Sequence, residues 1–261
     1  MFSAMEQPWL SVVVPAYNEE RDIAEAVTAL CCWLDQRDRP YEVIVVDNAS
    51  EDRTAELLEP LLDGGQVRLL RNEANRGKGY SVRRGMLDAS GRLRLSCDVD
   101  CLPSLVSLPR MLEAIEDADV VPGSRLGTGA RVTRQQPLRR RIVGWPFIAL
   151  TRLLMAEPTR DVYCGFKLWR GTAAQAVFAR QRLDGWVFDA ESLGMARRLG
   201  FRIDEVGIVW TDRDTSKLSI LKTFVPAVTE LLAARRSVWR QDRARPVAAA
   251  GPLAEPPESS L

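Results

Sequence analysis

Strand-like and helix-like patterns alternate along the first half of the chain, and this alternation constrains the fold more than any other feature. A continuous apolar run, as expected for a strand buried on both faces, covers residues 10–15, and residues 42–46 form the next predicted strand. Residues 19–34, between them, carry apolar side chains at helical spacing. Further segments alternate at 67–70, 78–88, 93–97, 104–116 and 119–121. This order predicts an α/β fold with a doubly wound, mostly parallel sheet flanked by helices.

Polar residues follow three of the predicted strands. They form the segments Pro15–Glu19, Asp47–Ser50 and Asp98–Asp100. Ligands of parallel sheets bind outside the carboxyl ends of the strands, so the three segments should share one site. Asp98 and Asp100 are two residues apart and would face the same side of an extended chain. Carboxylate oxygens with room for water suit Mg²⁺ or Mn²⁺ shared with a substrate phosphate, which indicates a nucleotide-diphosphate site.

The charge balance and the rare residue types exclude several functions. The 36 basic and 35 acidic residues nearly cancel, which argues against a nucleic-acid binder. The chain has no histidine, so Ser-His and Cys-His catalysis are excluded. Five cysteines, an odd number, indicate reduced thiols and a cytoplasmic location, and their spacing disfavours a zinc site.

No export or membrane-spanning segment is expected from the residues. Residues 1–10 lack the basic start and apolar stretch of a secretory signal. The longest apolar run, 142–150, is about half of the roughly 20 residues that a membrane-spanning helix needs.

The second half of the chain is less regular. Residues 127–141 are polar and rich in arginine, which predicts a loop, and residues 138–156 form a basic amphipathic segment. Strands are expected at 162–169 and 202–210, and helices at 189–199 and 220–239. Residues 241–261 are rich in Pro, Ala and Ser, which predicts a disordered tail.

Eight sequence blocks occur in a characteristic order. They are VVVPAYNE (12–19), VDNASEDRT (46–54), NRGKGYSVRRGM (75–86), DVD (98–100), GSR (123–125), DVYCGFKLW (161–169), GWVFDAE (185–191) and EVGIVWTDRDTSKL (205–218). In these blocks the chain resembles the inverting glycosyltransferases of family 2 with the GT-A fold. The similarity is greatest to the branch that acts on dolichyl phosphate.

This resemblance implies a Rossmann-like GT-A domain over residues 1–240. Residues 9–125 would bind the nucleotide sugar and residues 126–240 the acceptor. The implied reaction is metal-dependent, with Mg²⁺ or Mn²⁺. It transfers a hexose from a nucleoside diphosphate sugar to a polyprenyl or dolichyl phosphate. Glucose is the favoured hexose, and UDP is favoured over GDP in the donor. The protein would contact the cytoplasmic face of a membrane as a peripheral protein. A soluble hydroxyl acceptor and a non-catalytic nucleotide-sugar binder remain alternatives. The oligomeric state is open.

Three features depart from the family pattern. Asp47-Asn48-Ala49-Ser50 stands where the family usually has Asp-Asp-Gly-Ser, so only the first carboxylate is kept. Cys101-Leu102-Pro103 replaces a commonly polar segment after the metal pair. The membrane spans of many relatives are also not expected here.

The resemblance assigns the donor site to residues at the strand ends. Asp98 and Asp100 would hold the metal, with Asp100 the more direct ligand. Pro15, Ala16, Tyr17, Glu19 and Asp47 would surround the nucleobase, although Pro15 and Tyr17 also suit a structural turn and Glu19 a helix start. Lys78, Arg125 and Lys217 would bind phosphate, and a salt bridge to Asp98 or Asp119 is the alternative for Arg125. The remaining donor contacts are Val99, Cys164 and Gly165, the last of which would let the sugar approach closely.

The acceptor site is assigned in the same way. Asp189 would act as catalytic base for a hydroxyl acceptor, or would orient the substrate when the acceptor is a phosphate, and helix capping is its alternative. Trp186 would pack against a hexose or fill the core. Arg131 would meet an anionic head group or be solvated, and Glu191 would contact the acceptor.

Overall fold

A seven-stranded sheet forms the centre of the computed structural model, which describes residues 7–134, 138–155, 158–211 and 220–241. Its strands lie in the order β3-β2-β1-β4-β7-β5-β8. Their bounds are β1 Leu10–Ala16, β2 Tyr41–Asp47, β3 Val67–Arg71, β4 Leu93–Cys97, β5 Val120–Ser124, β7 Phe166–Arg170 and β8 Val206–Gly207. A second, two-stranded sheet pairs β6 (Arg131–Arg134) with β9 (Val209–Thr211) in parallel.

The prediction of a mostly parallel sheet is confirmed. Strand β1 pairs in parallel with β2 and β4, β2 with β3, and β5 with β8. Strand β7 differs, because it runs antiparallel between β4 and β5. Its start therefore lies at the same sheet edge as the ends of its two neighbours.

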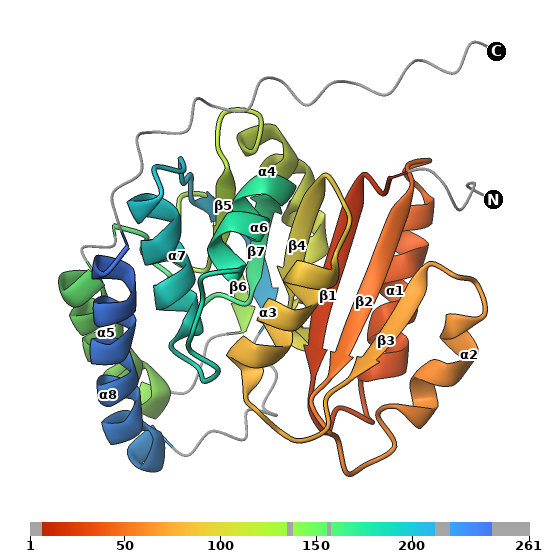
Figure 1. Cartoon of the computed structure of the whole chain (residues 1–261). Helices are drawn as coiled ribbons and strands as arrows, with labels where there is room; N and C mark the ends of the chain where they lie inside the picture. Colours follow the sequence, from red (N-terminus) through yellow and green to blue (C-terminus); the bar gives the residue numbers. More distant parts are fainter. Residues whose placement is uncertain (1–6, 135–137, 156–157, 212–219, 242–261) are drawn as a thin grey trace.

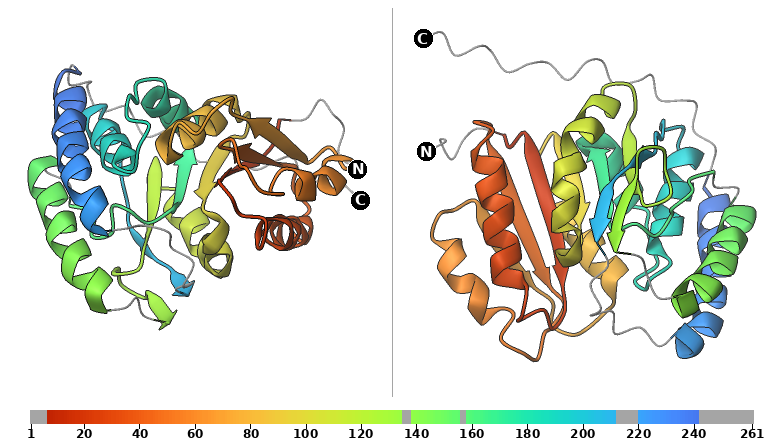
Figure 2. Two further views of the ribbon diagram at one scale, coloured as in Figure 1. Left: turned by 90° about the horizontal axis from the view of Figure 1, so that it is seen from below. Right: turned by 180° about the vertical axis from the view of Figure 1, so that it is seen from behind.

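Helices cover both faces of the large sheet (Figures 1 and 2). One face carries α1 (Ile23–Asp35), the 3₁₀ segment η2 (Val99–Ser107) and α4 (Leu108–Ala114). The other face carries α3 (Lys78–Asp88), α6 (Gly171–Phe178) and α7 (Phe188–Arg198). Helices α5 (Leu138–Met155) and α8 (Ile220–Trp239) lie side by side next to α7, at the end of the molecule away from β3. The short segments η1 (Glu56–Leu58) and α2 (Glu59–Leu62) lead into β3.

The apolar pattern of the strands explains the two layers. In β1, Val12 and Val14 pack into the core cluster on the α1 side, whereas Val13 packs into the cluster on the α3 side. Successive side chains of a strand point to opposite faces, so a strand buried on both sides has to be apolar throughout.

Several predicted elements differ from the structure. Residues 127–141, predicted to be a loop, contain β6 and the start of α5, because β6 pairs with the distant β9. The strand predicted at 202–210 is divided between β8 and β9. Residues 242–261, where a disordered tail is predicted, lie outside the described residues. None of the helices in the described ranges has the length and hydropathy that a bilayer span requires.

Candidate active site

The carboxyl ends of β1, β2, β4 and β5 and the start of β7 meet at one edge of the sheet. The residues predicted from the strand ends, Tyr17, Asp47 and Asp98, directly follow or end these strands. Helix α7 begins with Asp189 in its first turn. The topology thus places the predicted donor residues along one edge.

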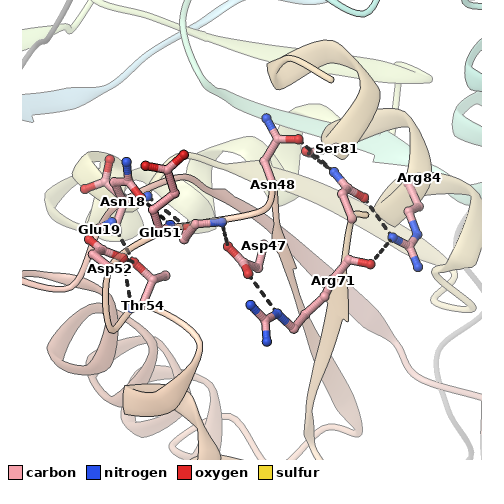
Figure 3. A network of polar contacts seen from close by, with 12 residues as sticks. Asn18, Glu19, Asp47, Asn48, Glu51, Asp52, Thr54, Arg71, Ser81 and Arg84 are labelled. Carbon is pink, nitrogen blue, oxygen red and sulfur yellow. Dashed lines mark hydrogen bonds and ion pairs between the residues drawn. The ribbon is translucent and has the colours of Figure 1, made fainter. Parts of the chain in front are cut away.

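The loops after β1 and β2 are fastened together by side chains of the second loop (Figure 3). The backbone N–H of Asn18 donates to Ser50 Oγ at 2.9 Å, and that of Glu19 donates to Thr54 Oγ1 at 2.8 Å. In return, Asn18 Oδ1 accepts the N–H of Glu51 at 2.9 Å. The VDNASEDRT block therefore shapes the loop that carries Tyr17 and Glu19.

The clamp uses the side chains of Ser50 and Asp52. Ser50 and Asp52 have the residue types and position to cap a helix that reaches Leu62. Instead, Asp52 accepts the N–H groups of Glu20 at 3.2 Å and Thr54 at 3.0 Å, and only the short η1 and α2 follow. The two side chains serve the site edge and not a helix start.

Asp47 ends β2 and is fully buried. Its Oδ1 accepts the backbone N–H of Ser50 at 3.0 Å, and Arg71 Nε donates to its Oδ2 at 3.1 Å. A hollow beside it is lined by Ala49, Ser50, Arg71, Asn72 and Glu73. A nucleobase that uses Asp47 has to meet Arg71 as well, so Arg71 is a residue of the candidate site that the motif pattern did not reveal.

Asn48, which stands where the family usually has a second carboxylate, organises the next loop. Its Nδ2 donates to Asn75 Oδ1 at 2.8 Å. Its Oδ1 accepts from Asn72 Nδ2 at 2.9 Å and from the N–H of Arg76 at 3.1 Å. An amide can donate and accept at once, which a carboxylate cannot, so this departure has a structural use just before Lys78.

Asp98 lies at the end of β4 and forms an ion pair with Lys78, whose Nζ is 2.6 Å from Oδ2. A Cβ atom on Gly165 would lie 1.8 Å from the same oxygen. Gly165 therefore leaves room for the Asp98 carboxylate. Whether a sugar also passes over it stays a prediction.

Asp100 does not lie on an extended chain, as the two-residue spacing suggested. It belongs to the 3₁₀ segment η2, which starts directly after Asp98. Burial of Lys78 opposes its charge, but Asp98, Asp189 and Asp100 together hold the pKa of Lys78 above its ordinary value. Both predicted metal ligands therefore act on one ammonium group. Val99 between them packs its side chain into the core, which leaves only its backbone for a ligand.

The carboxylate oxygens of Asp98 and Asp100 suit a hard divalent cation that is also bound by a substrate. Among the residues whose positions are described, no group of three or more His, Cys, Asp or Glu side chains could hold a metal. Two carboxylates remain, and the cation that Asp98 already binds is the Lys78 ammonium. A Mg²⁺ or Mn²⁺ ion here would take its other ligands from water and the donor's diphosphate.

Asp189 forms a second buried ion pair. Lys167 on β7 donates from Nζ to Asp189 Oδ1 at 2.5 Å and also to the carbonyl of Cys164. Asp189 is only 4% exposed and Lys167 only 1%. Burial raises the pKa of Asp189 above its ordinary value, and Lys167 and Lys78 counteract this. Burial likewise raises the pKa of the Cys164 thiol to about 12, so it stays protonated.

Two further residues predicted to bind the acceptor are Trp186, in the loop before α7, and Glu191, in the first turn of α7. Trp186 is 46% exposed, and its ring centroid lies 5.4 Å from Lys78 Nζ. Glu191 is fully buried and accepts the backbone N–H groups of Arg182 and Leu183, the latter at 2.8 Å. Contact between Glu191 and an acceptor does not fit this burial. Its place in the structure is to fix the loop at residues 182–183.

The two remaining arginines predicted to bind anions are Arg125 and Arg131. Arg125 donates from Nε and Nη2 to Asp161, both at 2.7 Å, and not to the Asp98 or Asp119 partners considered from sequence. Arg131 is exposed on β6. Lys217 lies outside the described residues. Phosphate binding by Arg125 therefore stays a prediction.

A family model described as glycosyl transferase family 2 matches residues 11–182. The chain belongs to glycosyl transferase family 2. It is 34% identical over 225 residues to a Drosophila melanogaster protein named dolichyl-phosphate beta-glucosyltransferase, covering 80% of this chain and 69% of that protein. A Dictyostelium discoideum protein of the same name is 30% identical over 241 residues, covering 87% and 74%. The chain is therefore a glycosyltransferase, as its motifs predict.

Solved structures confirm the GT-A type of fold for this family member. Glucosyl-3-phosphoglycerate synthase from Mycobacterium tuberculosis, in complex with Mn²⁺, UDP and glucosyl-3-phosphoglycerate, superposes with a TM-score of 0.66 at 20% identity. The match covers 87% of this chain and 80% of that one. The same synthase has been solved with Mg²⁺ and UDP. At this identity the likeness shows the fold alone.

Proposed function

We propose that this protein transfers glucose, with inversion, from UDP-glucose to dolichyl phosphate or a related polyprenyl phosphate, with the help of Mg²⁺ or Mn²⁺. The names of its relatives, dolichyl-phosphate beta-glucosyltransferases, support the sugar and the acceptor. The UDP and Mn²⁺ complexes of its structural neighbour support the donor and the metal. The strand-end residues Tyr17, Asp47, Asp98 and Asp100 would bind the donor.

One observation carries the choice of acceptor: the carboxylate in the position of a catalytic base is already paired. Lys167 Nζ lies 2.5 Å from Asp189 Oδ1, and the Lys78 ammonium acts on the same carboxylate. Burial raises the pKa of Asp189, but a base for a hydroxyl acceptor also needs an available lone pair directed at the acceptor, and Lys167 holds the Oδ1 atom of this carboxylate. A phosphate acceptor is already ionised near neutral pH and is attracted by ammonium groups. The site therefore suits a phosphate better than an alcohol.

The proposed reaction follows from this arrangement. An oxygen of the acceptor phosphate attacks the anomeric carbon of glucose, and the bond from that carbon to the donor's diphosphate breaks. The electron pair of the broken bond leaves with UDP. Lys78 would hold the diphosphate and Trp186 would offer its exposed ring to the sugar. Asp189, fixed by Lys167, would orient a sugar hydroxyl. A divalent cation at Asp98 and Asp100 would stabilise the charge that develops on the leaving group.

The acceptor also determines where the protein works. A polyprenyl phosphate stays in the bilayer, so we propose that the protein meets it as a peripheral protein at the cytoplasmic face. The basic segment that includes α5 is our candidate for this contact, and Leu153 on α5 is 77% exposed. Sedimentation with vesicles that contain anionic lipid tests this assignment. The matched control for Leu153→Glu is Val106→Glu, because Val106 on η2 is also exposed, at 63%.

The decisive experiment compares two acceptors that differ only in the phosphate. The protein is incubated with labelled UDP-glucose, Mn²⁺ and either dolichyl phosphate or dolichol, with GDP-mannose as a second donor. We expect a lipid-linked glucose from dolichyl phosphate only. Equal transfer to dolichol would contradict the argument from Asp189. Transfer to 3-phosphoglycerate but to no lipid would favour the soluble acceptor. UDP binding without transfer or hydrolysis would favour a non-catalytic binder.

A further inference from the structure

The predicted metal ligand Asp98 already holds a cation that belongs to the protein. Lys78 Nζ lies 2.6 Å from Asp98 Oδ2, and the two side chains are only 17% and 25% exposed. Surface ion pairs contribute little because water screens both charges. This pair is largely shielded from water, so its charges interact more strongly than those of a surface pair. The surrounding structure positions both side chains.

Two glycines fix the two sides of the pair. Gly77, directly before Lys78, has φ +100°, and a Cβ atom there would lie 2.3 Å from the carbonyl oxygen of Asp184. Gly165 leaves the space that the Asp98 carboxylate fills. The next turn is held as well, because the N–H of Tyr80 donates to the Asp184 carbonyl at 3.2 Å. The chain is therefore built to bring this ammonium to this carboxylate.

A divalent cation and the ammonium group compete for the same carboxylate. A metal at Asp98 needs a lone pair of the carboxylate that Lys78 uses, and two positive charges at that distance repel strongly in a partly shielded site. A donor's diphosphate changes this balance, since it gives the ammonium a new anionic partner and gives the metal further oxygen ligands.

We propose that Lys78 is a resident counter-ion that keeps the divalent-cation site closed until a nucleoside diphosphate arrives, and then moves from Asp98 to the diphosphate. This inference rests on the proposed donor site. It explains why the site needs no third carboxylate: the closed state is neutralised by Lys78, and the open state is completed by the substrate. Because Lys78 neutralises Asp98 when no donor is bound, the site should bind a divalent cation only weakly without the nucleotide sugar.

The test measures Mn²⁺ binding, with the free ion followed by electron paramagnetic resonance and without sugar or acceptor. For the wild type we expect weak binding of Mn²⁺ alone and much tighter binding when UDP is present. In Lys78→Met and Lys78→Gln, the affinity for Mn²⁺ alone should rise on the order of tenfold, because one repelling charge is removed. The gain on adding UDP should shrink in both variants.

Two further variants sharpen the result. Arg76→Met removes a cation two residues away that pairs with Asp184, with 3.7 Å between Arg76 Nη2 and Asp184 Oδ2. The Mn²⁺ affinity of this variant should stay close to that of the wild type. Lys78→Arg keeps the charge and should keep the dependence on UDP. Unchanged or weaker Mn²⁺ binding in folded Lys78→Met or Lys78→Gln would overturn the inference. Equal gains in Lys78→Met and Arg76→Met would overturn it too, because general charge would then explain both.

This outcome can be separated from that of the proposed function. The binding measurement contains neither glucose nor lipid, so a UDP-dependent Mn²⁺ site controlled by Lys78 stands even when no lipid-linked glucose is formed. Conversely, lipid-linked glucose formed by a wild type that binds Mn²⁺ equally with and without UDP would support the function and refute the role of Lys78.

Discussion

Replacing Lys167 by Met tests the electrostatic argument of the acceptor site. Lys167 and its partner Asp189 are almost completely buried, and Lys167 Nζ donates to both Asp189 and the carbonyl of Cys164. Methionine keeps an unbranched side chain of similar length but has no charge and no N–H. The variant therefore leaves a buried carboxylate without its nearest counter-ion, which is the costly way to break such a pair.

The magnitude follows from the alternative open to Asp189. A carboxylate that loses its partner in a buried site takes up a proton, so the charge contribution cannot exceed the cost of protonation. For an aspartate with a reference pKa of about 3.9, this cost is roughly 4 kcal/mol at pH 7 and about 1.5 kcal/mol at pH 5. Loss of the hydrogen bond to Cys164 adds about 1 kcal/mol at either pH. Because burial already raises the pKa of Asp189 in the wild type, these figures are upper limits, and we expect a destabilisation of at most about 5 kcal/mol at pH 7.

Urea unfolding at pH 7, 6 and 5 checks this expectation. Burial raises the pKa of Asp189 in the folded wild type, and loss of Lys167 should raise it further. The folded state then binds more protons than the unfolded state between the unfolded and the raised folded pKa. Stability of the variant therefore falls as pH rises through this window. The difference from wild type should shrink from pH 7 to pH 5, by at most about 3 kcal/mol.

A second substitution provides the control. Asp189→Asn in the Lys167→Met background removes the charge that causes the penalty, so the double variant should be more stable at pH 7 than Lys167→Met alone. A destabilisation by Lys167→Met that is the same at pH 7 and pH 5 would refute the reasoning. So would a double variant that is less stable than the single one, because packing and not charge would then account for the loss.

Three further predictions concern other parts of the site and its sheet. Ala49 has φ +59°, a strained conformation for a residue with a Cβ atom. Ala49→Gly should raise the free energy of unfolding by roughly 0.5–1 kcal/mol in thermal denaturation, because the strain removed is larger than the stabilisation of the unfolded chain by the greater entropy of glycine. Burial opposes the charge of Glu42, but hydrogen bonds from Ser11, Ser90 and Arg68 lower its pKa. Glu42→Gln should therefore cost about 1–3 kcal/mol at pH 7, with the difference lost as pH falls through that lowered pKa. Asp100→Asn should abolish UDP-dependent Mn²⁺ binding in calorimetry and reduce glucose transfer on the order of 100-fold.

The fold and the position of the site follow from the order of the elements. Apolar strands that alternate with helices specify a parallel sheet, and the polar residues after them must gather at one edge. The direction of β7 does not follow, because a short apolar strand has the same pattern in either direction. The pairing of β6 with β9 was missed for a related reason, since it joins residues almost 80 positions apart.

The sequence predicted which residue types line the site, but not their partners. Arg125 was expected to meet Asp98, Asp119 or a phosphate, and it binds Asp161. The family resemblance assigned Glu191 to the acceptor, yet this residue lies in the first turn of α7 and is fully buried. Arg71 carried no motif at all. Long-range contacts of this kind depend on where β7 and the loop before α7 lie, which spacing along the chain does not encode.

These partners share a pattern that changes how the site should bind its substrates. Each of four predicted functional charges is neutralised by a side chain from a different element: Asp47 by Arg71, Asp98 by Lys78, Asp189 by Lys167 and Arg125 by Asp161. A ligand therefore binds by exchanging partners, and its affinity reflects the difference between the old and the new contacts. A nucleoside monophosphate offers fewer anionic oxygens for such an exchange than a diphosphate. These ion pairs should therefore make the site bind a nucleoside diphosphate, which the transfer reaction requires, more tightly than a monophosphate.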